Sequence, residues 1–162
     1  MKTREHKDQN IIDSVIKNCE ICFVGLVTHQ GPYVIPMNFG YRDGKLFLHS
    51  APEGTAVEAL EADPRVSICF CKGGKLVYQH KEVACSYSMH STSVVVKGKV
   101  SFIEDMDSKR EALDIIMENY TNMSFTYSDP AVRNVKVWQI EIEEITCKEF
   151  GIPNSQYRQK YL

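Results

Sequence analysis

Long apolar runs and a clear excess of either charge are both missing from this sequence of 162 residues. No apolar segment approaches the roughly 20 residues that cross a bilayer, so we expect no membrane partner. Lys and Arg number 19 against 21 for Asp and Glu, which gives a formal net charge of −2. This balance leaves no surplus of basic residues to neutralise a nucleic-acid backbone, and we expect no nucleic-acid partner.

An export signal and a metal-site signature are also missing. The opening residues, MKTREHKDQN, are polar and lack the apolar core of a signal peptide, so we expect a cytoplasmic protein with reduced cysteines. The spacing of Cys69, Cys71, His80, Cys85 and His90 does not match a zinc site, and we predict no metal. Cys85 and His90 have no carboxylate placed nearby in the sequence to orient the histidine, which favours a buried thiol over a nucleophile.

Six short segments carry the β-branched and aromatic residues that favour strands, and turn signals separate them. They are residues 21–28, 34–41, 46–50, 66–71, 93–103 and 135–145, with turns predicted at 42–45 and 72–75. Gly98, in the middle of the fifth segment, predicts a bulge or a sharp bend. This pattern predicts a mainly β fold, a six-stranded antiparallel barrel with flanking helices. We expect one domain over residues 1–162, with 1–9 and 152–162 as peripheral tails.

Three amphipathic segments predict helices. Residues 10–18 have apolar side chains at helical spacing, and Asp63-Pro64 ends a helix that begins near Thr55. Thr55 with Glu58, and Ser108 with Glu111, have the spacing of capping boxes. Residues 119–134 predict an irregular connection.

The Thr55 helix begins directly after the strand that ends at His49 and Ser50. Its first-turn amide groups and the positive end of its dipole would therefore lie beside a sheet, where they attract a phosphate or a carboxylate. The alternative interpretation is an ordinary strand-to-helix connection, because most capped helices bind nothing.

The order P-M-N-F-G-Y-x-D-G-x-L-F-x-H-S-A-x-E-G-T over residues 36–55, followed by L-E-A-D-P-R-V at 60–66, resembles a known family. It is similar to the nitroimidazole-resistance branch of the pyridoxamine 5'-phosphate oxidase-like flavoproteins, the FMN-binding split barrels. The resemblance continues through C-S-Y-S-M at 85–89, the strand that contains Gly98, the helix near 107–120 and the last strand. It covers nearly the whole chain from residue 8 to 151.

The resemblance implies a split β-barrel that forms a homodimer, with FMN held in the cleft between two barrels. It places the flavin ring beside the backbone of residues 35–38, and the ring or ribityl chain beside residues 49–51. Gly54 and Thr55 would bind the phosphate, and two serines would add hydroxyl groups. The implied cofactor-binding residues are Ile35, Pro36, Met37, Asn38, His49, Ser50, Ala51, Gly54, Thr55, Ser91 and Ser93.

The implied activity is an FMN-dependent oxidoreductase that reduces a small aromatic or nitro compound, with a reduced nicotinamide as a candidate electron donor. His49 is the candidate catalytic residue, because an imidazole beside the ring could supply a proton; the alternative is a structural histidine. Ala56 and Thr92 stand where this family often has cations that pair with phosphate. They favour a second hypothesis, a non-catalytic dimer that binds a flavin, haem or an anionic metabolite.

Overall fold

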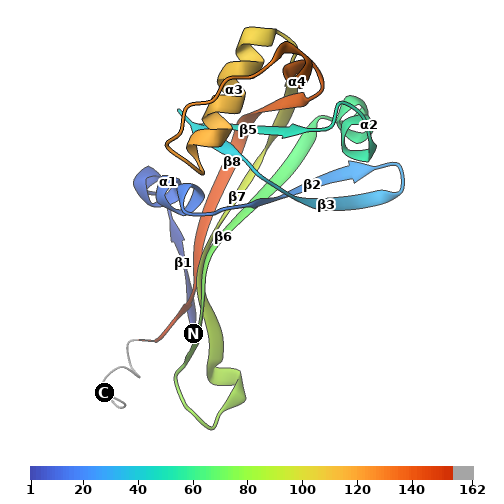
Figure 1. Ribbon diagram of the computed structural model, residues 1–162. Coiled ribbons are helices and arrows are strands. Elements are labelled where there is room, and N and C mark those ends of the chain that lie inside the picture. Colours follow the sequence, from blue (N-terminus) through green and yellow to red (C-terminus); the bar gives the residue numbers. More distant parts are fainter. Residues whose placement is uncertain (155–162) are drawn as a thin grey trace. The chain divides into compact units, whose positions relative to one another are not determined.

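The computed structural model describes residues 1–154, which form four α-helices, one short 3-10 helix and eight strands (Figure 1). The helices are α1 (Gln9–Lys17), α2 (Thr55–Ala62), η1 (Ala84–Ser86), α3 (Met106–Glu118) and α4 (Asp129–Arg133). The strands are β1 (Lys2–His6), β2 (Cys22–Thr28), β3 (Gly31–Met37), β4 (Gly40–Arg42), β5 (Lys45–Ser50), β6 (Arg65–Tyr78), β7 (Tyr87–Ile103) and β8 (Lys136–Ile152). None of the described helices is long and apolar enough to span a bilayer.

The strands form one sheet in the order β3-β2-β6-β7-β8-β5-β4, and β1 pairs with β8 beside this path. The pairs β1–β8, β2–β3, β2–β6, β4–β5 and β5–β8 are all antiparallel. The predicted mainly β, antiparallel fold is therefore confirmed. The predicted count of six strands is wrong, because the described residues form eight.

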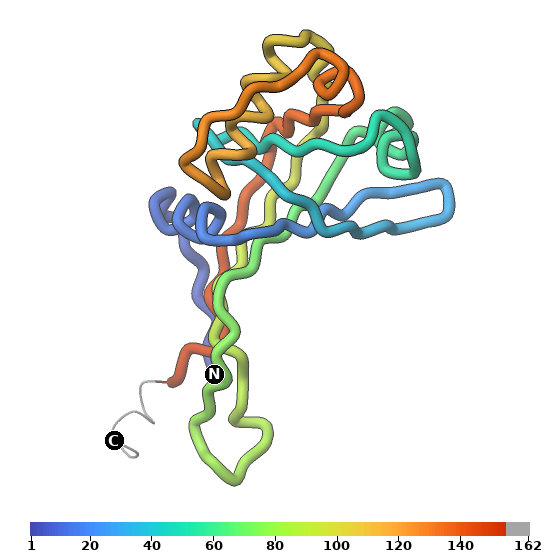
Figure 2. The backbone as a smooth tube through the Cα atoms, viewed as in Figure 1, coloured from blue at the N-terminus to red at the C-terminus, as the bar shows by residue number. Residues whose placement is uncertain are grey.

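The chain divides into two compact units, each of which contains part of the long strands β6, β7 and β8. The larger unit consists of Glu20–Cys69 and Val96–Ile145. The smaller unit consists of Met1–Cys19, Phe70–Val95 and the described part of Thr146–Leu162. Figure 2 follows the backbone from β6 through η1 into β7, a connection that lies wholly in the smaller unit.

The larger unit has its core between the sheet and helix α3. Phe47 of β5 and Val137 of β8 are buried against Ala112, Ile115 and Ile116 of α3. β5 is apolar on both faces, and its neighbour Trp138 is completely buried. The burial of such side chains stabilises the fold at roughly 25 cal/mol per Å². This packing fixes the end of β5, from which three predicted site residues extend.

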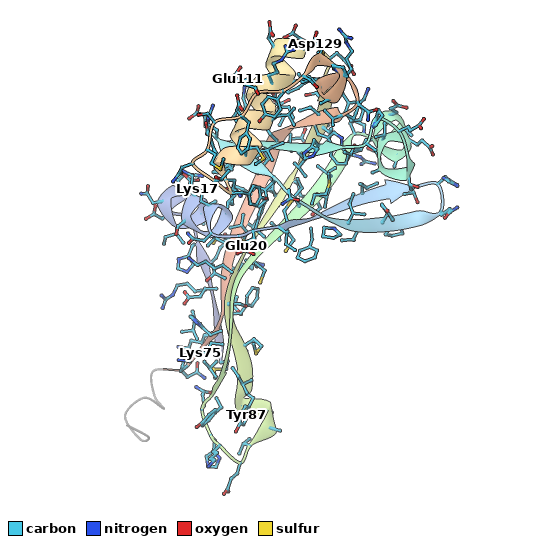
Figure 3. The ribbon with its side chains drawn as sticks, in the orientation of Figure 1. Lys17, Glu20, Lys75, Tyr87, Glu111 and Asp129 are labelled. Atoms are coloured by element: carbon cyan, nitrogen blue, oxygen red, sulfur yellow. The ribbon has the colours of Figure 1, made fainter. Side chains whose placement is uncertain are left out.

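In the smaller unit, helix α1 is capped by Asp8, whose carboxylate accepts a hydrogen bond from the Asn10 amide. Its apolar side chains Ile12, Val15 and Ile16 are buried, as their spacing predicted. The unit also holds a stacked aromatic pair: the ring centroids of Tyr78 and Tyr87, the latter labelled in Figure 3, lie 4.9 Å apart.

The first predicted hairpin needs correction, and part of the predicted N-terminal tail is a strand. Residues 2–6 form β1, an exposed strand that pairs with β8 from Lys2 to His6. Residues 34–41 do not form one strand: β3 pairs with β2, and the chain crosses through Asn38 and Phe39 before β4 pairs with β5. The turn at Asp43 and Gly44 is as predicted. The predicted tail beyond residue 154 lies outside the described residues.

Other local predictions also failed for identifiable reasons. Residues 72–75 continue β6 instead of turning, with Gly73 and Gly74 at φ values of 103° and 133° that suit glycine. The N-cap of α3 is Asp105 and not Ser108. The Asp105 carboxylate accepts a hydrogen bond from the backbone amide of Ser108, with a donor–acceptor distance of 2.8 Å. The connection predicted to be irregular contains α4.

Candidate functional site

The predicted flavin-ring segment lies on an edge strand of the larger unit. Ile35, Pro36 and Met37 end β3, which pairs with β2 on one side only and stands last in the strand order. Pro36 lies opposite Phe23 and is exposed, so its missing N–H removes no central ladder bond. The outer edge of β3 therefore offers backbone N–H and C=O groups to a planar ligand.

Asn38 follows β3 and is exposed, whereas the next residue, Phe39, is fully buried. The Phe39 amide donates to the Tyr120 hydroxyl at 3.0 Å, and that hydroxyl donates to the Glu20 carbonyl at 2.8 Å. A single phenol thus anchors the chain immediately after the proposed ring segment. Sequence reasoning missed Tyr120 because it lies 81 residues from Phe39.

His49, Ser50 and Ala51 lie at the end of β5. His49 pairs in register with the buried Val137 and is itself exposed, but partial desolvation of its imidazole lowers its pKa below the ordinary value of 6.5. A lowered pKa keeps the ring neutral at neutral pH, so it is a weak acid there. The Ser50 hydroxyl accepts from the Trp138 indole N–H and donates to the Ala51 carbonyl.

Gly54 and Thr55 form the exposed start of α2. The N-cap is Gly54, at φ 122°, and no side chain caps the helix. The predicted Thr55 capping box is therefore wrong, although the predicted start is correct. Without a capping side chain, the exposed Thr55 hydroxyl and the first-turn amides are donors of the kind that fit an anionic phosphate.

Four cations that could replace the missing phosphate partners already have carboxylate neighbours. The ion pairs are Arg65 with Asp63, Lys97 with Glu144, Lys99 with Glu143 and Arg133 with Asp129. The Arg65 guanidinium holds the pKa of Asp63 at about 2. These pairs are exposed and individually weak, but each competes with a phosphate for the same cation.

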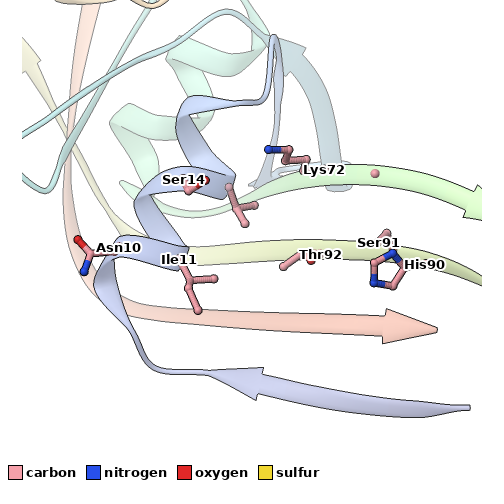
Figure 4. Close-up of a pocket in the computed structure, with 9 residues that line it drawn as sticks. Asn10, Ile11, Ser14, Lys72, His90, Ser91 and Thr92 are labelled. Carbon is pink, nitrogen blue, oxygen red and sulfur yellow. The ribbon is translucent and has the colours of Figure 1, made fainter. Parts of the chain in front are cut away.

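Ser91 and Ser93, the remaining predicted cofactor residues, belong to the smaller unit. Ser91 lines a cavity of about 420 Å³ there, together with Lys72 and His90 (Figure 4). Ser93 is half-buried on β7 and does not line that cavity. The structure therefore brings the other nine predicted residues into the larger unit and these two into the smaller one.

A carboxylate in the smaller unit joins two histidines. Glu149 accepts from His6 at 2.9 Å and His90 at 3.0 Å, and these hydrogen bonds lower the pKa of Glu149, so the carboxylate stays ionised. The expectation that no carboxylate orients His90 is wrong. Glu149 lies 59 residues from His90 in sequence, and only the β-strand arrangement brings the two side chains together.

The described residues contain no group of His, Cys, Asp and Glu side chains that could hold a metal ion. The chain does contain one C-x-x-C spacing, at Cys19 and Cys22. Both thiols are buried and donate to backbone carbonyls, those of Val15 and Met37 respectively. Buried thiols of this kind behave as small apolar groups.

The mainly β, antiparallel fold is that of the split-barrel proteins, as the comparison with solved structures shows. The chain belongs to the pyridoxamine 5'-phosphate oxidase family, whose model matches residues 8–149. A solved structure from Bacteroides thetaiotaomicron, named as a candidate 5-nitroimidazole antibiotic resistance protein, is 53% identical. The alignment covers 92% of this chain and 88% of that one, with a TM-score of 0.84. The predicted family is therefore confirmed.

Two more distant structures share the fold. The flavocytochrome Anf3 from Azotobacter vinelandii is 17% identical to this chain, with a TM-score of 0.82. The alignment covers 98% of this chain and 76% of the Anf3 chain. The FAD and heme binding protein from Mycobacterium smegmatis is 15% identical, with a TM-score of 0.81. That alignment covers 98% of this chain and 80% of the other chain. The comparison with curated proteins found no match.

Proposed function

We propose that this protein is an FMN-dependent oxidoreductase that reduces a small aromatic or nitro compound. The observation that carries the proposal is membership of the pyridoxamine 5'-phosphate oxidase family, together with 53% identity to a candidate nitroimidazole-resistance protein. When bound, FMN would supply the redox chemistry, taking electrons from a donor such as a reduced nicotinamide and passing them to the substrate.

The larger unit provides groups of the kinds that a flavin requires. The open edge of β3 at residues 35–38 would hydrogen-bond the polar edge of the ring, and residues 49–51 would lie along the ring or ribityl chain. The exposed Gly54 and Thr55 donors would hold the phosphate. Ser91 and Ser93 stay predicted cofactor residues, to be tested separately because they belong to the smaller unit.

His49 is the proposed catalytic residue of this site. Because its pKa is lowered, its imidazole is neutral at neutral pH and has one N–H to donate. A neutral N–H can hold an oxygen of the substrate, such as a nitro oxygen, without charging the site. Proton delivery would then depend on pH, since protonation of His49 requires acidic solution.

The homodimer implied by the family resemblance is part of the proposal. One face of the β2–β3 hairpin exposes Phe23, Val27 and Val34, which keep 44%, 58% and 63% of their surface accessible. In the β2–β3 register these residues lie opposite Pro36, Pro32 and Gly25 respectively, so the apolar face is continuous. An apolar face of this kind is typical of a surface that a second copy covers.

The test of turnover is anaerobic. Protein loaded with FMN is mixed with a reduced nicotinamide and a nitroimidazole, and the absorbance of the nitro compound is followed. We expect loss of the nitro band at a rate proportional to protein, and a rate at least about tenfold lower for His49→Gln, a range common for a lost acid–base or hydrogen-bonding group. No turnover by flavin-loaded protein with nicotinamide or a chemical reductant would refute the oxidoreductase function.

A second candidate function is binding without turnover, of a flavin, haem or an anionic metabolite. The neutral Ala56 and Thr92 favour it, as do the ion pairs that already occupy Arg65 and Lys97. Solved relatives of the same fold are named as a flavocytochrome and as an FAD and heme binding protein. Saturable flavin binding with no catalysed reduction of any nitro or quinone acceptor would favour this function.

A further inference from the structure

The cavity of the smaller unit has a polar side and an apolar side. Figure 4 shows helix α1 on one side and strands β6 and β7 on the other. Ile11 and Val15 of α1 contribute the apolar surface. Asn10, Ser14, Ser91 and Thr92 add amide and hydroxyl groups, and Lys72 and His90 complete the polar side. Its volume of about 420 Å³ is within the range of pockets that bind small molecules.

The charges around this cavity are one-sided. No Asp or Glu lines it, and Lys72 supplies a full positive charge. Lys72 forms no ion pair with any carboxylate of the described residues, in contrast to the four paired basic residues above. An unpaired ammonium group beside hydroxyl donors favours an anion, because charge-assisted hydrogen bonds are stronger than neutral ones.

His90 is held in a fixed orientation at the cavity wall. Its Nε2 atom bonds to Glu149, whose other oxygen accepts from His6. This arrangement uses Nε2 as the donor to Glu149, and in that tautomer Nδ1 is an acceptor that can take a hydrogen bond from an N–H or O–H group. The Glu149 carboxylate does not line the cavity, so it positions His90 without placing a negative charge against the ligand.

We infer that this cavity is a second binding site, separate from the proposed flavin site, for the anionic group of a small organic molecule. Lys72 binds the anionic group, the hydroxyls of Ser91 and Ser14 complete its hydrogen bonds, and an apolar body packs on Ile11 and Val15. The anionic group is a carboxylate or a phosphate. Both chemistries fit these donors, and the experiment distinguishes them.

The test uses three probes with one aromatic body: benzoate, phenyl phosphate and the neutral benzyl alcohol. Binding to the full-length protein is followed through the backbone amide resonances of residues 11–15, 72–73 and 90–92. We expect at least one anion to bind saturably, at least about tenfold more tightly than benzyl alcohol. The tighter of the two anions identifies the group as a carboxylate or a phosphate.

Two variants separate a specific site from general charge. Lys72→Gln is expected to remove the advantage of the anion over benzyl alcohol. Lys75→Gln, at an exposed β6 position labelled in Figure 3 that does not line the cavity, is expected to retain it. Equal binding of anion and alcohol, or equal losses in the two variants, would overturn the inference.

Competition with FMN tests whether the sites are separate, since Ser91 is also a predicted cofactor residue. We expect saturating FMN to leave anion binding at residues 90–92 unchanged. Displacement of the probe by FMN would overturn the inference and assign the cavity to the flavin. A protein that binds the probe but not FMN would refute the proposed function and leave this inference standing.

Discussion

The indole N–H of Trp138 donates a hydrogen bond to the hydroxyl of Ser50, with a donor–acceptor distance of 3.2 Å. Trp138 is the only tryptophan in the chain and has no accessible surface. Ser50 is also one of the predicted flavin contacts. The same hydroxyl therefore satisfies a buried donor in the core and lies at the end of β5, where the proposed site begins.

Replacing Ser50 with alanine should destabilise the fold, because the buried Trp138 N–H would lose its acceptor. Such a loss costs about 1–3 kcal/mol. The measurement is urea unfolding followed by the fluorescence of the single tryptophan. Ser50→Thr, which keeps the hydroxyl, is the matched control and should lose less. Equal stability of Ser50→Ala and wild type would show that the bond contributes nothing.

Position 98 requires glycine because the backbone of the neighbouring strand β8 lies too close for a side chain. A Cβ atom at this position would lie 2.1 Å from the carbonyl oxygen of Glu141 on β8. Gly98→Ala should therefore cost about 3 kcal/mol or more, or prevent folding, because the β7 and β8 backbones would have to separate. Yield of folded protein and urea unfolding give the measurement.

Gly25→Ala is the matched control for Gly98→Ala. A Cβ at Gly25 would lie 3.3 Å from the Ser67 carbonyl oxygen, which a small shift relieves. We expect this variant to fold with a smaller loss of stability. If both alanine variants were equally stable, the close approach of β8 would not be the reason for glycine at position 98.

His49 should make the stability of the protein depend on pH near neutrality. Partial desolvation lowers its folded-state pKa below 6.5, so the unfolded state binds more protons between that lowered value and 6.5. The free energy of unfolding should therefore fall as the pH drops below about 6.5. Above pH 6.5 the stabilising contribution of His49 should be fully present. Urea unfolding between pH 5 and 8 measures the slope.

The His49→Gln variant should have a shallower slope over that range, since it cannot take up the proton. His29→Gln, in the exposed turn after β2, is the control and should resemble wild type. Parallel stability curves for wild type and His49→Gln would show that the partial desolvation of His49 does not oppose its protonation.

Local patterns predicted most of the secondary structure because they depend on neighbouring residues. The apolar spacing in α1 and the Asp43-Gly44 turn are examples, and both form as expected. The cap of α3 was assigned to Ser108 because its spacing to Glu111 fits a capping box, yet Asp105 provides the acceptor. Several side chains compete for one set of helix amides, and sequence alone does not rank them.

Long-range contacts explain what sequence could not predict. Residues 1–9 carry no strand signal in the sequence, but Lys2–His6 pairs with the end of β8, about 145 residues away. Glu149 could not be assigned to His90, nor Tyr120 to Phe39, without the strand arrangement. The family resemblance identified candidate flavin residues, whereas the cavity at Lys72 has no local sequence signal at all.

The most direct test of the proposed function is titration of flavin-free protein with FMN, followed by quenching of flavin fluorescence. We predict saturable binding with a micromolar or lower Kd, which corresponds to about −8 kcal/mol or stronger. Replacing Thr55 with valine should weaken binding severalfold, because the exposed hydroxyl at the start of α2 would be lost. No saturation up to near-millimolar FMN would contradict the proposal that this protein is an FMN enzyme.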